Sequence, residues 1–595
     1  MDALLSATAA QGACAISVSN SISVAIDRCV LIQKSPGEKP PPLVEISQLV
    51  MDISLSNSLL IGGTGLASRG QGDRPWTLAA ALTVRRNLFL CTLSGIDCDP
   101  ATLYFLNHTI RDNTFVGCSV AGVSAFGTVL SGQGGVSRVE ISRNILHASG
   151  DAVVAGLDDL TISGNSISAD ADSKTRSSDK SGIRILSKCQ SPEATPGVER
   201  CHILENRIDG CAGYGIVIKS AVESLMIKQN FIEDIGNTGI HVDADATVAD
   251  LAIENNQFRH IGVKPFEDKM SDAWGIVLQR VQSGRIAGNS FRFIGDATAG
   301  LRECGAISLR GCGRIQVTEI TADDIGPATS NETDVSVFDV RFAVTTAAFD
   351  RNRAAGTGNS WCALRVLHDV QQRAEAVMSD LYETLVYVPI QADPPAKTRL
   401  KRSSIFDPAK DSVTWTPGGL RVWRSPKNSI ELTGNTVEGT SNASLVDVHA
   451  EELTFNRNTI NGDRENAKLP MIALEAGQCE IIGNRLTGTG PQALAAKVLH
   501  NSVQSGVCLF NDNRVDLTLD GEGDLLYIEA EAAIVHANYV KAKKSTGNVH
   551  IVVNKTKEEW DCTVLGNIVG NGAIKIGNAP PAPLAPPWDS LNHIQ

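Results

Sequence analysis

A short motif that recurs along almost the whole chain constrains its folding more than any other feature. The motif reads apolar-x-apolar-x-x-Asn, and each copy is followed by further apolar residues at alternate positions. Typical spacings are 21 residues from Asn144 to Asn165 and 26 residues from Asn230 to Asn256. Repeats of this length are typical of solenoids, in which each unit packs on its neighbours. The copies end at Asn87, Asn144, Asn165, Asn206, Asn230, Asn256, Asn289, Asn435, Asn458, Asn484, Asn513, Asn538 and Asn567.

A second motif, Gly or Ala followed by apolar-x-apolar, falls between the asparagines. The two motifs together predict coils of two or three short strands, with alternate residues pointing into a narrow core. Equivalent residues then stack ~4.8 Å apart in successive coils. We expect each Asn to occupy a left-handed turn and to form a hydrogen-bonded ladder, and each Gly to make a sharp corner. The second motif begins at Gly182, Gly215, Gly239, Gly275, Gly305, Ala363 and Gly419.

This pattern resembles the parallel β-helix repeats of the pectate-lyase-like superfamily over residues 15–570, apart from one insertion. The resemblance implies an all-β, single-stranded, right-handed parallel β-helix solenoid. Residues 1–366 would form its first part and residues 412–575 its continuation. Residues 367–411 break the rhythm, and we expect a lateral insertion there, a short helix plus a basic loop. The Pro-rich residues 576–595 are expected to cap the last coil, with Trp588 covering its end.

Composition narrows the classes of partner and cofactor. The net charge of −13 and the absence of a basic stripe argue against nucleic acid. No apolar run is long enough for a membrane span, and the first residues lack a secretory signal. We therefore expect cytoplasmic synthesis, with an extracellular location inside an assembly left open. The 14 cysteines include no C-x-x-C pair, so they are interpreted as small buried hydrophobes. No cofactor is expected; calcium is left open, although no motif supports it.

The densest polar cluster on the predicted outward positions is centred on His241 and Asp243. Both point to the same side of one strand, and an Asp/His pair beside a cation can remove a proton next to a carboxylate. These two are the candidate catalytic residues. The superfamily's familiar signatures, those of polygalacturonases, C5-epimerases and calcium-dependent pectate lyases, are absent. Candidate substrate-binding residues on neighbouring coils are Arg184, Lys219, Asp245, Trp274, Gln279 and Arg310.

Two hypotheses about function follow. The first is a non-catalytic β-helix rod, about 100 Å long if some 20 coils stack, that binds a glycan or a protein surface or serves as a spacer. It would belong to a phage-tail-like or secreted assembly, and the tailspike analogy would make it a homotrimer. The second is a polysaccharide lyase, epimerase or glycosidase that uses the face of His241 and Asp243. The same scaffold serves both classes, so the fold does not decide between them.

Overall fold

The computed structural model divides into two compact units, Met1–Cys304 and Gly305–Gln595, and each is described by itself. Every regular element among the described residues is a β-strand. The prediction of an all-β parallel solenoid is therefore confirmed. The residues that the structure describes are 14–33, 40–68, 77–98, 103–126, 138–156, 158–169, 180–186, 197–262, 271–295, 301–326, 333–341, 344–358, 360–366, 412–416, 419–423, 429–464, 467–498, 506–519, 524–543, 549–555, 562–570, 572–576 and 592–594.

The first unit contains the strands up to β26, and the division falls inside β27. In chain order they are β1 (Ile16–Asp27), β2 (Val30–Ile32), β3 (Val44–Ser56), β4 (Leu59–Ser68), β5 (Thr77–Arg85), β6 (Leu88–Cys98), β7 (Leu103–Arg111), β8 (Thr114–Cys118), β9 (Ala121–Phe126), β10 (Arg138–Ser142), β11 (Ile145–Ala148), β12 (Asp151–Gly156), β13 (Asp159–Ser163), β14 (Ser166–Ala169), β15 (Ile183–Ile185), β16 (Gly197–Leu204), β17 (Arg207–Asp209), β18 (Ile216–Ile218), β19 (Ala221–Lys228), β20 (Phe231–Ile235), β21 (Ile240–Val242), β22 (Val248–Glu254), β23 (Gln257–Ile261), β24 (Ser271–Gln279), β25 (Val281–Ala287), β26 (Ser290–Ile294) and β27 (Leu301–Arg310).

The second unit continues from β28. Its strands are β28 (Arg314–Thr318), β29 (Thr321–Ile325), β30 (Asp334–Arg341), β31 (Thr346–Asp350), β32 (Arg353–Thr357), β33 (Trp361–Val366), β34 (Ser412–Thr416), β35 (Gly419–Trp423), β36 (Ser429–Thr433), β37 (Thr436–Thr440), β38 (Val446–Asn456), β39 (Thr459–Asp463), β40 (Ile472–Ile482), β41 (Arg485–Gly490), β42 (Leu494–Val498), β43 (Val507–Asn511), β44 (Arg514–Leu519), β45 (Leu526–Ala530), β46 (Ala532–His536), β47 (Tyr539–Lys543), β48 (Val549–Lys555), β49 (Cys562–Leu565), β50 (Ile568–Gly570), β51 (Gly572–Ile576) and β52 (His593–Ile594).

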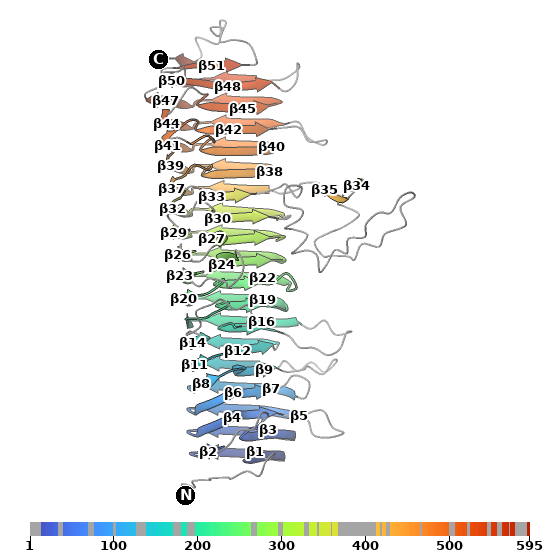
Figure 1. Cartoon of the computed structure of the whole chain (residues 1–595). Coiled ribbons are helices and arrows are strands. Elements are labelled where there is room, and N and C mark those ends of the chain that lie inside the picture. The colour runs from blue at the N-terminus through green and yellow to red at the C-terminus, as the bar shows by residue number, and fades with distance from the viewer. Residues whose placement is uncertain are drawn as a thin grey trace. The chain divides into compact units, whose positions relative to one another are not determined.

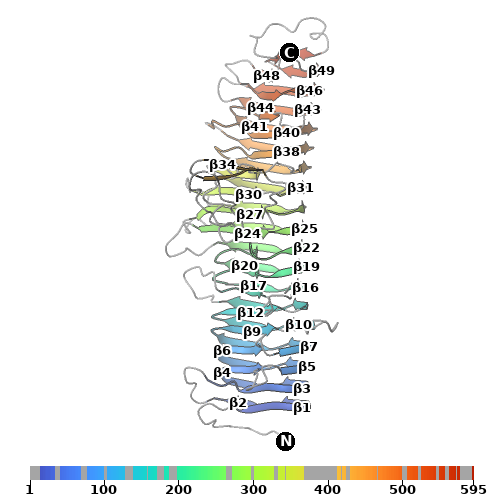
Figure 2. The ribbon, with the colours of Figure 1, turned by 90° about the vertical axis from the view of Figure 1, so that its right-hand side faces the viewer.

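Within each unit the strands stack as parallel coils, which Figures 1 and 2 show from two sides. From β10 onward in the first unit, each coil supplies three strands, and each strand pairs with the one three places later. Thus β16, β17 and β18 pair in parallel with β19, β20 and β21. Ile183, Ile216 and Ile240 are register partners in successive coils and are all fully buried. The alternation of apolar residues therefore builds a continuous core along each unit.

The predicted asparagine ladder is present in both units. Asn206 illustrates it: its backbone amide and its Nδ2 both donate to Oδ1 of Asn230, at 2.9 and 3.0 Å. The same Nδ2 also donates to the carbonyl of Ile162, at 2.9 Å. The left-handed residue, however, is the one before each asparagine, such as Glu205 with φ of 55°. The asparagine amide instead satisfies the backbone groups that the turn leaves unpaired.

The glycines that precede the strands have a second role besides the predicted corner. Gly215 does not have a positive φ, and a Cβ there would lie 2.6 Å from the carbonyl oxygen of Gly239 in the next coil. Gly215 does lie at a bend, as predicted for a corner, and its small size is required because neighbouring coils approach closely. Elsewhere in the core, large side chains stack on their register partners, and the ring centroids of Phe89 and Phe115 lie 4.6 Å apart.

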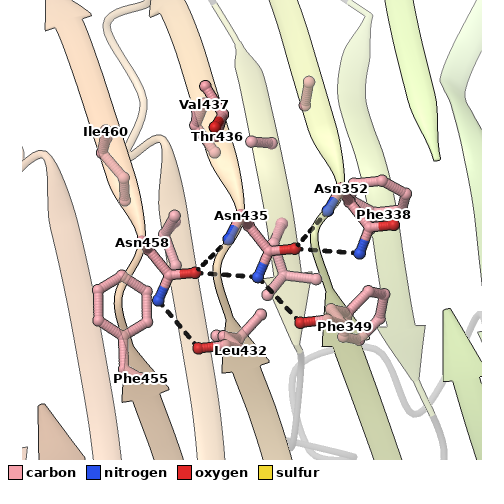
Figure 3. Close-up of a pocket in the computed structure, with 14 residues that line it drawn as sticks. Phe338, Phe349, Asn352, Leu432, Asn435, Thr436, Val437, Phe455, Asn458 and Ile460 are labelled. Atoms are coloured by element: carbon pink, nitrogen blue, oxygen red, sulfur yellow. Dashed lines mark hydrogen bonds between the residues drawn. The ribbon is translucent and has the colours of Figure 1, made fainter. Parts of the chain in front are cut away.

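In the second unit the ladder runs past a small gap in the core. Figure 3 shows Asn352, Asn435 and Asn458 bonded in sequence beside this gap. The cavity has a volume of about 20 Å³ and is lined mainly by apolar side chains, among them Phe349 and Phe455. A space of this size holds one water molecule at most, so it is not a ligand site.

The predicted continuation of the solenoid from residue 412 starts too early. Gly419 opens β35, which pairs antiparallel with β34 in a separate two-stranded sheet. The parallel coils resume at β36, whose Ser429 pairs with Thr346. The Gly-apolar-x-apolar motif is short enough to fit a hairpin strand as well as a coil. The predicted insertion, 367–411, and the predicted cap around Trp588 lie outside the described residues.

Candidate functional site

Two of the candidate residues of the first unit, Arg184 and His241, share one outward column. Val154, Arg184, Val217, His241 and Val277 are register partners in successive coils. The valines on either side of His241 are buried, Val217 at 0% and Val277 at 2% exposure. The imidazole itself is half-buried, with its ring 5.0 Å from that of Tyr214. This column is therefore not an open platform along which a polymer could lie.

Asp243 lies where the strand β21 has ended and a turn begins. Its backbone carbonyl accepts a hydrogen bond from the amide of Ala246, at 3.0 Å. Its carboxylate accepts one from the amide of Asp245, at 3.5 Å. The proposed catalytic role of His241 and Asp243 stays a prediction, since these contacts describe a turn and not a reaction centre. The described residues contain no group of three or more His, Cys, Asp and Glu arranged to hold a metal ion.

The predicted substrate-binding residues are dispersed. Arg184 forms an ion pair with Asp151 of the coil before it, at 3.1 Å, and both side chains are largely buried. Trp274 is 1% exposed and therefore belongs to the interior. Lys219 and Gln279 are half-buried, Asp245 is exposed, and Arg310 belongs to the second unit.

The second unit carries a more extensive polar surface that the sequence reasoning missed. We call it the lateral face: the outward residues of β38, β40, β42 and β45, which lie in two columns. One column contains Asp447, Ala473, Ala495 and Tyr527, and the other contains His449, Glu475, Lys497 and Glu529.

Two side chains of this face are shorter than their neighbours in the column, and we call the stretch over them the trough. Ala473 and Ala495 are half-buried and lie between Asp447 and Tyr527 in the first column. With one coil every ~4.8 Å, the strands of Asp447 and Tyr527 are roughly 14 Å apart. The hydroxyl of Tyr527 donates to Glu529 at 3.3 Å, which fixes the ring at that end. The trough therefore has an aromatic ring at one end and hydrogen-bonding groups along one side.

The imidazole of His449 lies between two carboxylates. Its Nε2 is 3.4 Å from Oδ1 of Asp447, and its Nδ1 is 3.4 Å from Oε2 of Glu475. Asp447, and then Glu475, raise the pKa of His449 from 6.5 to about 9, against the opposing effect of partial burial. At neutral pH this residue is therefore a cation that donates two charge-assisted hydrogen bonds.

We predict that this clamp makes the stability of the second unit fall at alkaline pH. A folded-state pKa of about 9, above the ordinary 6.5, gives a contribution that is complete below about pH 6.5 and lost as the pH rises through 9. Because the side chain is 38% exposed, we expect only about 1 kcal/mol. Urea unfolding at several pH values should show this loss in the wild type and not in His449→Gln. An NMR titration that placed the pKa of His449 near 6.5 would contradict the prediction.

Next to the lateral face lies a buried charged cluster built from β27, β30 and β33. Asp339 is fully buried, and its Oδ2 lies 2.5 Å from Nε of Arg341 and accepts a hydrogen bond from Ser308 at 3.2 Å. Arg365 is the register partner of both Asp339 and Asp447, so it connects the cluster to the lateral face. Arg310, one of the predicted binding residues, donates from Nε to Ser308 and is part of this cluster.

Comparison with known families agrees with the coil geometry. Residues 91–312 match the family model described as a right handed beta helix region. The chain is a right-handed parallel β-helix repeat protein. No curated protein matches the sequence of this β-helix.

The cysteines and the membrane-span prediction can also be compared with the described residues. Cys201, Cys479 and Cys508 are buried, as predicted, and form no disulfide. Cys29 is half-buried, and the side chain of Cys562 is not described. Burial raises the pKa of Cys201 to about 12, so this thiol keeps its proton. The part of the β-helix that the structure describes has no helix long and apolar enough to cross a membrane.

Proposed function

We propose that this β-helix is a non-catalytic recognition protein that binds a neutral glycan on its lateral face. The trough over Ala473 and Ala495, with Tyr527 at one end, is the observation that carries the proposal. An aromatic ring offers an apolar surface to one face of a sugar, and the carboxylates and the ammonium group alongside can bond its hydroxyls. The regular spacing of the coils suits an extended, repeating ligand.

The charges of the lateral face favour a neutral ligand over an acidic one. Three carboxylates, those of Asp447, Glu475 and Glu529, face two cations, His449 and Lys497. His449 is already paired with two carboxylates, and its single positive charge leaves that group of three with a net negative charge. An acidic glycan would need unpaired cations, and this surface does not supply an excess of them.

The state of His449 supports binding without turnover. A general base must be unprotonated before it can accept a proton, so its pKa must lie near the working pH. With a pKa of about 9, the imidazole of His449 stays protonated at neutral pH and cannot accept another proton. Its role in the proposal is to hold Asp447 and Glu475 in fixed positions as hydrogen-bond acceptors.

The proposal is tested by binding of neutral and acidic glycans from an array, followed by calorimetric titration of any that bind. We expect a neutral glycan to bind and Tyr527→Ala to weaken it about tenfold or more, since an aromatic contact contributes roughly 1.5 kcal/mol. Tyr539→Ala is the matched control, because Tyr539 is an exposed tyrosine of β47, away from the lateral face. Binding of acidic glycans alone, binding of a protein alone, or equal affinity of the two variants would contradict the proposal.

A further inference from the structure

An unusual aliphatic surface lies on a different sheet, near the N-terminal end of the first unit. The strands β2, β4, β6, β8 and β11 pair in parallel, each directly after the ladder position of its coil. Their outward residues form two columns that are almost entirely aliphatic. We call this surface the aliphatic patch: Val30, Leu59, Leu88 and Ile145 in the first column, where Thr114 lies between Leu88 and Ile145, and Ile32, Ile61, Leu90 and Val116 in the second.

The side chains of the patch are exposed to a degree unusual for aliphatic residues. Ile32 is 39%, Leu88 37%, Leu90 36%, Val116 37% and Ile145 44% exposed. Together with the half-buried members they present roughly 400 Å² of apolar surface, the size at which such patches mark interaction sites. A contiguous surface of this kind is costly to leave in water, so we expect it to be covered in the working protein.

The composition of the patch is not a general property of this sheet. Further along the first unit the same two columns become mostly polar. The first column continues with Ser166, Arg207, Phe231, Gln257 and Ser290, and the second with His147, Ser168, Glu233, Arg259 and Arg292. Aliphatic residues are therefore concentrated on five successive coils.

The patch has a groove along one side. A hollow of about 510 Å³ lies between the first column and the residues that precede the ladder positions, including Arg28, Asn57 and Arg86. The charges there are largely balanced within the chain, because Arg28 pairs with Asp27 at 3.2 Å and Arg143 with Asp112 at 2.8 Å. A partner that covers the patch consequently needs no compensating charge.

We propose that the aliphatic patch binds the same patch of a second copy of this chain. A twofold axis parallel to the stack of coils would run the strands antiparallel across the contact. The second column of each copy, a ridge containing Leu90 and Val116, would then lie over the groove beside Leu88 of the other. Contact between identical surfaces is the usual basis of a twofold dimer.

The area supports a second copy as the occupant. A stable dimer buries about 800 Å² per partner, with an apolar centre and a polar rim. The aliphatic patch would supply about half of this area as the centre, and the groove residues Arg28, Asn57 and Arg86 would supply the rim. The rows of the patch repeat once per coil, and a second copy offers rows with the same coil spacing.

Sedimentation velocity of the full chain over a hundredfold range of concentration tests the proposal. We expect a monomer–dimer equilibrium in the wild type and a weakening of about 100-fold or more in Leu88→Lys/Leu90→Glu, which would place charges in the apolar centre. Gln257→Lys is the matched control, since Gln257 is an exposed residue of the same column outside the patch. Ile145→Lys should repeat the effect at the far end of the patch, and circular dichroism should show that all variants fold.

A wild type that remains a monomer at every concentration would overturn the proposal. A dimer that persists in both Leu88→Lys/Leu90→Glu and Ile145→Lys would also overturn it. The inference does not rest on the proposed glycan site, because Tyr527→Ala should leave the dimer unchanged.

Discussion

Replacing Asn484 by alanine is expected to lower the free energy of unfolding by about 3–5 kcal/mol, because several buried hydrogen bonds are lost and their partner groups are left unpaired. The Nδ2 of Asn484 donates to the carbonyl of Phe455 at 2.7 Å and to Oδ1 of Asn513 at 2.9 Å. Its Oδ1 accepts from the amide and the Nδ2 of Asn458, at 2.8 and 3.1 Å. Alanine removes all four hydrogen bonds and leaves the buried Asn458 amide and Phe455 carbonyl unpaired.

Urea unfolding followed by circular dichroism measures this loss. Asn461→Ala is the control, because Asn461 lies in the same unit but is exposed, and it should change stability by only about 0.5 kcal/mol. If the two substitutions had similar effects, the ladder would not be a main source of stability.

Removing Asp339 is expected to have a comparable effect, about 3–5 kcal/mol for Asp339→Ala, because it leaves a buried cation without its counter-charge. Arg341 has a side-chain exposure of 8%, and Asp339, at 0%, is its partner. The double variant Asp339→Leu/Arg341→Met should recover most of the loss, since well-packed apolar pairs often replace buried ion pairs without cost.

The exposed pair of Arg351 with Glu319 provides the comparison for this prediction. Their side chains are 62% and 58% exposed, so Glu319→Ala should cost at most about 0.5 kcal/mol. Thermal unfolding of the four proteins measures the series. A single variant Asp339→Ala with wild-type stability would show that the buried cluster is not held together by this carboxylate.

The fold could be predicted because its signals are local and repeated. Each coil carries its own alternation and its own asparagine, and errors in one copy do not affect the others. The pattern still missed ladder positions where the preceding strand departs from the motif, such as Asn113, which donates to Oδ1 of Asn144. It also missed Asn352 and Asn592, which bond Asn435 and Asn567 respectively. The left-handed backbone was predicted at the asparagine but is found at the residue before it. The type of side chain alone does not show which residue of the turn has the positive φ.

The lateral face could not be found in this way because it depends on register between distant segments. Arg365 and Asp447 are partners in neighbouring coils although residues 366–446 lie between them in the chain. The local signal was present in Val446-Asp-Val-His449, a strand pattern with two polar residues on one side. Nothing in the sequence shows that Ala473 and Ala495 lie beside them as the floor of a trough. The cluster at His241 was favoured for its density, while the burial of Val217 and Val277 was not foreseeable from alternation.

The most direct test of a non-catalytic glycan-binding β-helix is to follow one bound neutral glycan by titration and then by mass spectrometry after prolonged incubation with excess protein. We predict saturable binding, weakened in Tyr527→Ala and unchanged in Tyr539→Ala, with the glycan recovered intact in its original mass and stereochemistry. A glycan that is cleaved or epimerised by the wild type, or one that does not bind at the lateral face at all, would contradict the account.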